Sequence, residues 1–442
     1  MSSGADIRKG RFTDGATPLF VAAKHSNAEV AALILEAGMV CEVEQKRASE
    51  KEAGEKKKKE EGKTKGRAGA AGKAGAAGTK GKAEGKAEGK EGQKKEEKEA
   101  SCRPHIVNQT TSDNRSPLYA ASISGSEDVV ALLLRVVHDD TGRAAGGVED
   151  AGGAGGAGGA AGAAVGATVA KVNMGTAPDK CTPLYVACQR GHVAVVRLLL
   201  QVGDINVNAT RADTGTTPLY TAAQNGHVDV LEHLLAVPTI DVNLAEIDDS
   251  YTPLHIASRR GHAMAVAALL AHRDVGAAQV NQGEDDGQTP LYLAANFGRE
   301  AVVALLLAIE GVDVNKATTD DAAVTALWVA SQEGEAGIVG RLLQIEGVDV
   351  NHMSGEDGST PLFMAANNGH AEVVALLLGK EGEDGEGITG VEINQGRTDN
   401  MATPLFTAAQ GGHSDVLRLL IDRGADLDVR NRDQDFALSI AA

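Results

Sequence analysis

The chain has 442 residues, with 43 Lys and Arg against 61 Asp and Glu, so its formal net charge is −18. A chain this acidic is not expected to be a general nucleic-acid binder, because phosphate contacts need a basic surface. Aromatic residues make up only 3% of the chain. This fraction excludes several ordinary aromatic-rich cores and favours thin layers of Ala, Leu and Val, with part of the chain unstructured.

The sequence predicts neither a membrane span nor a secretory leader. The longest apolar runs, Ala263–Ala271 and Ala301–Ile309, are nine residues each, whereas a span needs about 20. Residues 1–15 hold no apolar core for a signal peptide. The four cysteines form no C-x-x-C pair, which fits a reducing compartment. We expect a cytoplasmic protein. The basic run Lys56–Lys59 could instead be a nuclear import signal, or it could contact RNA or an acidic partner. The structural interpretation of the run is a solvated charge tract.

One motif recurs along the whole chain: Thr-Pro-Leu, followed in most copies by an aromatic residue. Thr is a good N-cap and Pro suits the first helical position, so each copy predicts the start of a helix. Two small residues and Gly-His follow, and Val-Val-x-Leu-Leu then predicts a second helix with one apolar face. A degraded tenth copy begins at Phe436. The nine full copies begin at Thr17, Ser116, Thr182, Thr217, Thr252, Thr289, Thr325, Thr360 and Thr403.

This recurring pattern resembles that of the ankyrin repeat family. The resemblance implies an all-α solenoid of about ten units, the last incomplete, in which helix–turn–helix units stack and finger loops project. One unit cannot bury both faces of its helices alone, so the apolar pattern also requires stacking. Copies from Thr182 to Thr360 are spaced by 35–37 residues instead of the family's 33, which predicts longer fingers. The Asp-Val-Asn segment that closes each unit is expected to be extended, like a strand.

Insertions interrupt the pattern after the second helix of a unit and before its Val-Asn segment. Two of them hold too few large apolar residues to fold. Insertions in the loops of a solenoid cost little closure entropy, so the stack should continue across them. We expect an N-terminal repeat in 1–43, a disordered Lys/Glu/Gly/Ala-rich insertion in 44–101, a repeat in 102–140, a flexible Gly/Ala-rich insertion in 141–169, and the other repeats in 170–442.

Two positions of the motif depart from the family pattern. The first copy has Ser26-Asn27 in place of Gly-His, and we expect a terminal unit weaker by roughly 1 kcal/mol if Ser26 is left-handed. The fourth position is aromatic in eight of nine copies, which we interpret as a buried seam between repeats. A ligand-binding ladder of aromatic rings is the alternative. The eight residues are Phe20, Tyr119, Tyr185, Tyr220, Tyr292, Trp328, Phe363 and Phe406.

No arrangement of side chains in the sequence indicates catalysis, a cofactor or a metal site. Gly385–Gly390 matches G-x-G-x-x-G, but a dinucleotide fingerprint needs a strand before it and a helix after it. Five of the twelve histidines occupy the Gly-His position, which gives them a structural role. Cys181 and Cys188 are expected to be buried and unreactive. We therefore expect neither an enzyme nor a bound cofactor.

In proteins of the family that this chain resembles, partners meet the fingers and the exposed face of the first helix. By analogy, the two residues before each Gly-His step face this concave groove, and most are polar. Phe297 is an exception and a candidate hot spot, with packing against the neighbouring repeat as the alternative. The groove residues are Gln189, Arg190, Gln224, Asn225, Arg259, Arg260, Asn296, Phe297, Gln332, Glu333, Asn367 and Asn368.

The finger tips are acidic and predict a basic peptide segment as partner, because a row of carboxylates attracts it and speeds association. The alternative is structural, since Asp favours turns. The tips also include Asp213, Glu284, Glu356, Asp357 and Asp399. The tip residues assigned to partner binding are Asp248, Asp249, Asp285, Asp286, Asp320 and Asp321.

The sequence therefore predicts a non-enzymatic scaffold or adaptor that binds partner proteins through the concave groove and the acidic fingers. The alternative is a truncated recognition arm of a larger enzyme, channel or regulatory protein, because the sequence ends inside the first helix of the tenth unit. In families like this one, finger asparagines such as Asn243, Asn315 and Asn351 can also be hydroxylated. We expect instead that each of them bonds the backbone of its own turn.

Overall fold

The computed structural model describes residues 15–37, 106–138, 170–379 and 390–437. The insertions predicted at 44–101 and 141–169 lie outside these ranges, so their disorder stays a prediction. The chain divides into two compact units, residues 1–187 with 201–205 and residues 188–200 with 206–442. Each unit is described by itself. Every groove and finger residue assigned to partner binding belongs to the second unit.

The first unit contains the first two repeats. Its elements are α1 (Pro18–Lys24), a helix over residues 28–37, η1 (Ile106–Asn108), α4 (Pro117–Ser124), α5 (Glu127–His138) and the start of α6 (Pro183–Arg190). Helix α1 packs against α4, and the Ser124 hydroxyl donates a hydrogen bond to the Ala23 carbonyl at 3.1 Å. The first repeat therefore packs on the second, although the sequence between them holds a long insertion.

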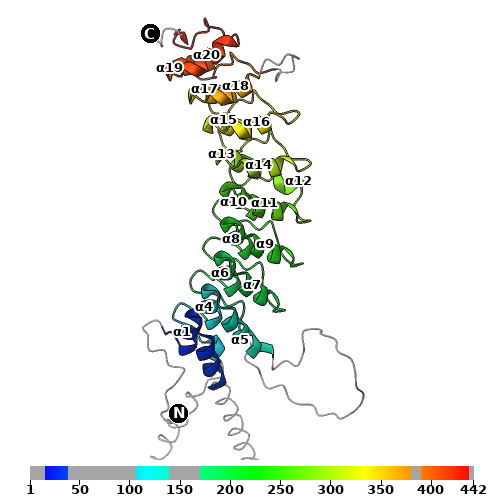
Figure 1. Cartoon of the computed structure of the whole chain (residues 1–442). Helices are drawn as coiled ribbons and strands as arrows, with labels where there is room; N and C mark the ends of the chain where they lie inside the picture. Colours follow the sequence, from blue (N-terminus) through cyan, green and yellow to red (C-terminus); the bar gives the residue numbers. More distant parts are fainter. Residues whose placement is uncertain (1–14, 38–105, 139–169, 380–389, 438–442) are drawn as a thin grey trace, which may run out of the picture. The chain divides into compact units, whose positions relative to one another are not determined.

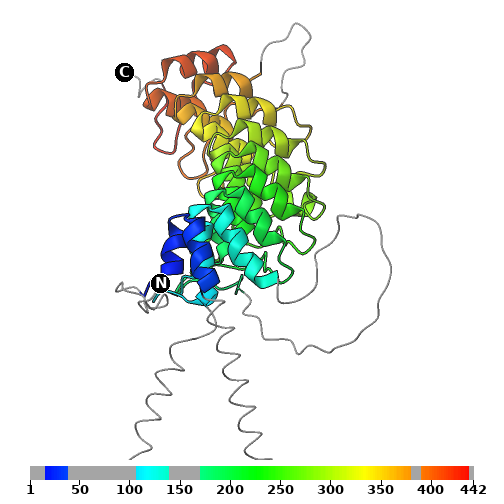
Figure 2. The ribbon, with the colours of Figure 1, turned by 60° about the horizontal axis from the view of Figure 1, so that its bottom comes forward.

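The second unit consists of two rows of helices (Figures 1 and 2). Each helix packs against the next one in its row. A short helix, α12 (Ala277–Val280), lies in one finger. The first helices of the repeats are α8 (Pro218–Asn225), α10 (Pro253–Arg260), α13 (Pro290–Asn296), α15 (Ala326–Glu333), α17 (Pro361–Asn367) and α19 (Pro404–Gln410). The second helices are α7 (Val193–Leu200), α9 (Val228–Leu235), α11 (Ala263–Leu270), α14 (Glu300–Leu307), α16 (Ala336–Leu342), α18 (Ala371–Leu377) and α20 (Ser414–Asp422). The two helices of each repeat pack together from α8 and α9 to α19 and α20.

The helices begin and end as the motif predicts. The Thr217 hydroxyl accepts a hydrogen bond from the backbone N–H of Tyr220 at 3.0 Å, with proline at the first helical position. A left-handed residue follows the first helix of a repeat, for example Gly226 with φ +68°. In the first repeat Ser26 occupies this position and has φ +56°. A side chain in that conformation is strained, which agrees with the expectation of a weaker first unit.

The Gly-His step joins neighbouring repeats. The Nε2–H of His370 donates a hydrogen bond to the carbonyl of Gln332, in the preceding repeat, at 3.0 Å. Its ring lies against Gly334, which has φ +78° and where an added Cβ would come 2.6 Å from His370 Nδ1. Backbone conformation and close packing thus both require glycine here. The same bond is made by His227 to Gln189, His262 to Gln224 and His413 to Asn367.

The Asp-Val-Asn segments are turns, and the prediction that they are extended is wrong. The described ranges contain no β-strand, only one isolated bridge between Arg430 and Phe436. The Asp241 carboxylate accepts a hydrogen bond from the backbone N–H of Asn243 at 3.1 Å. Such a bond two residues along the chain stabilises a turn, so the segment folds back before it can pair with another strand.

The asparagines of these turns bond the next repeat. Asn315 Nδ2 donates to the carbonyl of Gly347 at 2.8 Å, and its Oδ1 accepts from the N–H of Asp349 at 2.8 Å. The expectation that each asparagine bonds its own turn is therefore wrong, because the aspartate makes that bond. The series continues on both sides of the sequence insertions, since Asn108 accepts from Lys171 and Asn351 accepts from Glu392.

We expect Asn315→Ala to lower the free energy of unfolding by about 2 kcal/mol, because it removes two hydrogen bonds worth about 1 kcal/mol each. Urea unfolding followed by the fluorescence of Trp328, the one tryptophan of the chain, measures the change. Lys316→Ala alters the adjacent exposed residue and serves as the control. Equal effects of the two substitutions would show that the asparagine does not join the repeats energetically.

Candidate functional site

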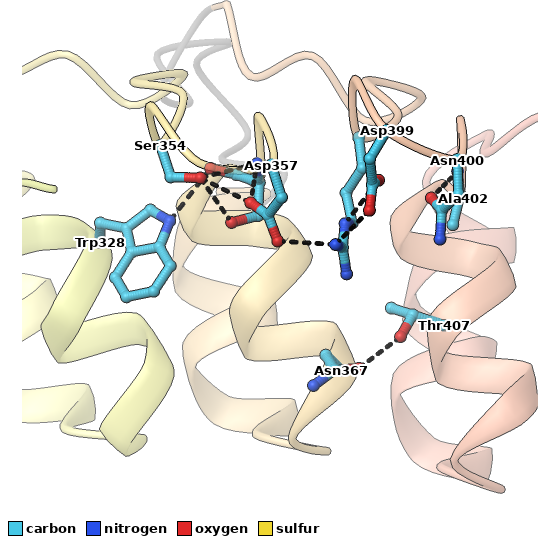
Figure 3. A network of polar contacts seen from close by, with 10 residues as sticks. Trp328, Ser354, Asp357, Asn367, Asp399, Asn400, Ala402 and Thr407 are labelled. Carbon is cyan, nitrogen blue, oxygen red and sulfur yellow. Dashed lines mark hydrogen bonds and ion pairs between the residues drawn. The ribbon is translucent and has the colours of Figure 1, made fainter. Parts of the chain in front are cut away.

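The predicted groove residues lie at the C-terminal ends of the first helices. In the pairs from Gln189-Arg190 to Gln332-Glu333 the first residue is half-buried and the second is exposed, whereas Asn367 and Asn368 are both exposed. Some of their polar groups already bond neighbouring repeats. Asn368 Nδ2 donates to the Gln332 carbonyl at 2.8 Å, and Asn367 Oδ1 accepts from the Thr407 hydroxyl at 2.5 Å (Figure 3). In two other pairs the amide nitrogen bonds within its own repeat, since Asn225 donates to the Thr221 carbonyl at 2.7 Å and Gln332 donates to the Glu333 carboxylate at 3.1 Å.

A finger is the loop between the second helix of one repeat and the first helix of the next. In the finger before α10, the backbone N–H of Glu246 donates to the carbonyl of Tyr251 at 3.0 Å. The Glu246 carboxylate accepts the N–H groups of Asp248, Asp249 and Tyr251 at 2.9, 2.7 and 3.3 Å. A glutamate therefore holds the tip from inside, while the two aspartates remain exposed.

Glu284 plays the same part in the finger before α13, and its assignment as a tip residue is wrong. It is only 8% exposed, and its carboxylate accepts the N–H groups of Asp286 and Gln288, both at 3.1 Å. Burial raises its pKa, and these two hydrogen bonds act in the opposite direction. The exposed acidic residues of this finger are Asp285 and Asp286.

Neighbouring finger tips are bonded to each other through their backbones. The N–H of Thr319 donates to the Asp286 carbonyl at 2.7 Å, and the N–H of Asp285 lies 3.5 Å from the Asp249 carbonyl. The N–H of Gly355 donates to the Ala322 carbonyl at 2.8 Å. The tips of successive fingers therefore form a continuous row with fixed spacing.

Several tip carboxylates are used within the fingers. Asp213 pairs with Arg211 at 2.7 Å, and Asp320 accepts the Thr318 hydroxyl at 2.6 Å. Arg397 bonds both Asp357 at 2.9 Å and Asp399 at 2.6 Å (Figure 3). These carboxylates support the structural interpretation of the acidic tips.

Asp357 shows how far such a carboxylate is committed to its own finger. Burial raises its pKa, but hydrogen bonds from Ser354 and Ser359 and the charge of Arg397 outweigh this effect. The pKa of Asp357 therefore lies below its ordinary value.

Five tip aspartates on three consecutive fingers are exposed and unused, and Glu356 on the next finger is exposed as well. Within the described ranges, no hydrogen bond or ion pair involves their side-chain oxygens. The finger before α8 pairs Asp213 with its own Arg211, and Arg397 of the finger before α19 pairs with its own Asp399 and with Asp357 of the finger before α17. We call this set the open carboxylate row; it consists of Asp248, Asp249, Asp285, Asp286 and Asp321.

One cation in the groove is stacked between aromatic rings. The Cζ of Arg259 lies 5.0 Å from the ring centroid of Phe297 and 5.7 Å from that of Tyr251. Phe297 is 39% exposed and Tyr251 is buried. Phe297 thus packs against the preceding repeat and still presents ring surface. Sequence reasoning missed Tyr251, whose signal was an aromatic residue directly before Thr-Pro.

The aromatic positions of the motif form a buried seam, as interpreted from the sequence. Tyr220, Phe363 and Phe406 are buried, and the half-buried Trp328 donates from Nε1 to the Ser359 carbonyl of the next repeat at 3.0 Å. Burial raises the pKa of Tyr292 to about 12. These rings are covered by packing between repeats, which does not favour the alternative of a ligand-binding ladder.

The described part of the chain contains neither a metal site nor a membrane-spanning helix. No three or more His, Cys, Asp or Glu side chains are placed there to hold a metal ion. None of the helices in those ranges has the length and apolar character needed to cross a membrane. Cys181 and Cys188 are buried, as expected, and burial raises the pKa of the Cys188 thiol.

Comparison with known proteins gives a family match. A family model described as ankyrin repeats (3 copies) matches residues 161–246, 241–318, 305–386 and 327–431, which is more than half of the chain. A single ankyrin repeat model matches residues 14–47. The crystal structure of the human ASB11 ankyrin repeat domain is similar over 51% of this chain and 92% of its own, with 28% identity and a TM-score of 0.42. None of the curated proteins matches the chain.

Proposed function

The chain belongs to the ankyrin repeat family, and from this premise we propose that it is a non-enzymatic scaffold that binds a basic segment of a partner protein at the open carboxylate row. Ankyrin repeats are general protein–protein interaction modules, and the family is typically non-enzymatic. The observation that carries the proposal is the difference between the finger aspartates: three consecutive fingers present five unused ones, whereas Arg211 and Arg397 neutralise Asp213, Asp357 and Asp399.

The row is suited to an extended basic segment. The backbone that carries these carboxylates is held by hydrogen bonds within and between fingers, so binding a cation orders little of the backbone. Each exposed ion pair contributes roughly 0.2–1 kcal/mol, and five such pairs distinguish a multiply charged segment from a single lysine. Salt screens exposed pairs, so the binding is expected to be salt-dependent.

The groove residues would hold the backbone of the same segment. Gln224, Asn225 and Gln332 offer amide groups that donate and accept hydrogen bonds. These groups fix the register of a bound chain without requiring a particular side chain.

We also propose the predicted division of the chain, with folded repeats separated by flexible insertions at 44–101 and 141–169, and a cytoplasmic location.

Replacing the five carboxylates of the open row by amides is expected to weaken binding of an oligolysine peptide about tenfold or more, because several pairs of roughly 0.2–1 kcal/mol are lost. Titration calorimetry at low and at physiological salt measures this loss. A control variant removes the same number of negative charges from exposed residues in or shortly after second helices: Glu232, Glu310, Glu346, Glu372 and Asp422.

The proposal requires the row variant to lose more affinity than the control variant at both salt concentrations. It also requires the row variant to lose most of the salt dependence. Equal losses would mean that the peptide responds only to the net charge of −18, and the proposed site would be wrong.

A further inference from the structure

Arg259 is a guanidinium held between two rings without a carboxylate beside it. Its side chain is half-buried and stacks on Tyr251 and Phe297. No ion pair joins it to any residue of the described ranges. The acidic group at the base of this finger, Glu246, is already bonded to three backbone N–H groups. Arg259 therefore makes no direct ion pair, although Glu246, Asp249 and Glu284 place negative charge near the same Tyr251.

A second stacked guanidinium in the same unit shows the contrast. Arg397 lies 5.6 Å from the ring centroid of Phe363 and is neutralised by Asp357 and Asp399. The repeat architecture can therefore place carboxylates around a stacked arginine. At Arg259 it does not, and the ring of Phe297 beside it is left partly exposed.

We propose that Arg259 anchors a carboxylate side chain of the bound partner, and that an apolar neighbour of this carboxylate lies on the ring of Phe297. Guanidinium groups bind carboxylates with two parallel hydrogen bonds. Because stacking already holds the Arg259 side chain, the pair forms with little further loss of side-chain freedom. Arginine and aromatic residues in such settings are frequent hot spots of interfaces.

This inference rests on the proposed function and makes the partner more specific. Tyr251, against which Arg259 stacks, closes the finger that carries Asp248 and Asp249. The anchor and the open carboxylate row are therefore linked through one finger. A segment that uses both carries basic residues for the row and one Asp or Glu, next to an apolar residue, for Arg259.

The test is a selection of random peptides displayed on phage against the full-length chain at physiological salt. The best acidic peptide and its Asn or Gln isostere are then titrated against four proteins: the natural chain, Arg259→Gln, Arg259→Lys and Arg418→Gln. Arg418 is an exposed residue of α20, and its replacement changes the net charge equally. Thermal unfolding of each variant shows that the repeats remain folded.

We expect enrichment of Asp or Glu beside an apolar residue, and about tenfold weaker binding of the isostere to the natural chain. This difference should vanish in Arg259→Gln, be reduced in Arg259→Lys and persist in Arg418→Gln. The proposal is overturned if no peptide binds, if acidic residues are not enriched, or if the isostere still binds more weakly to Arg259→Gln. Acidic selectivity that depends on Arg259, without any effect of the open carboxylate row, would overturn the proposed function alone.

Discussion

Gly334→Ala is expected to lower the free energy of unfolding by about 3 kcal/mol. Gly334 has φ +78°, and a left-handed residue with a side chain costs roughly 1 kcal/mol relative to glycine. The new Cβ would also lie 2.6 Å from Nδ1 of His370. The ring must move, which strains the packing by about 1–3 kcal/mol and weakens the bond from His370 to the Gln332 carbonyl.

Gly347→Ala is the matched control for this substitution. Gly347 has φ +82°, but no atom lies within 4 Å of the position of its added Cβ. Gly347→Ala should therefore lower the free energy of unfolding only by the backbone contribution of roughly 1 kcal/mol. Urea unfolding followed by circular dichroism measures both variants. If Gly334→Ala costs no more than Gly347→Ala, the Gly-His step does not join the repeats, and the glycine serves the helix end alone.

Acid is expected to destabilise the chain by about 2 kcal/mol between pH 7 and pH 5 through one buried histidine. His255 is fully buried; its Nδ1 accepts from the Thr252 backbone at 3.3 Å, and its Nε2–H donates to the Gln282 carbonyl at 2.9 Å. Burial lowers its pKa to about 4, against about 6.5 in an unfolded chain. Between these values the unfolded state binds more protons, so stability falls as the pH falls.

His255→Tyr isolates this contribution, because tyrosine occupies the same motif position in four other repeats. The unfolding free energy of both proteins is measured at pH 7 and pH 5. The variant should lose about 2 kcal/mol less than the natural chain over this range. Identical losses would show that His255 does not determine the acid sensitivity and that other groups, such as the carboxylates of the fingers, do.

Local signals explain how much of the fold could be predicted from the sequence. Thr217 accepts a bond from a residue three positions away, and Ser26 ends its helix by its own backbone conformation. Such interactions can be read within one repeat. The bonds of Asn315 reach residues more than 30 positions away. They depend on the register of two stacked repeats, and the prediction for the asparagines was therefore wrong.

The candidate site shows the same difference between signals within one repeat and contacts between repeats. The acidic tips were visible in the sequence, but which aspartates remain unused depends on their neighbours. Asp213 and Asp399 each follow an arginine by two positions, a local signal that could have identified the neutralised fingers. Glu284 stands where Thr318 and Ser354 stand in later repeats, which could have indicated its bracing role. The stacking of Arg259 on Phe297 joins two repeats and could not be found before they were placed side by side.

The central claim is that the open carboxylate row is where a basic segment binds. Carbodiimide joins a lysine amine to a carboxylate only when the two are in contact, so it reports the site directly. An isotope-labelled oligolysine peptide is cross-linked to the full chain, and mass spectrometry locates the modified residues. We predict cross-links concentrated at Asp248, Asp249, Asp285, Asp286 and Asp321. Cross-links spread evenly over exposed carboxylates, including Glu232 and Asp422 on second helices and Glu346 just after one, would contradict the account.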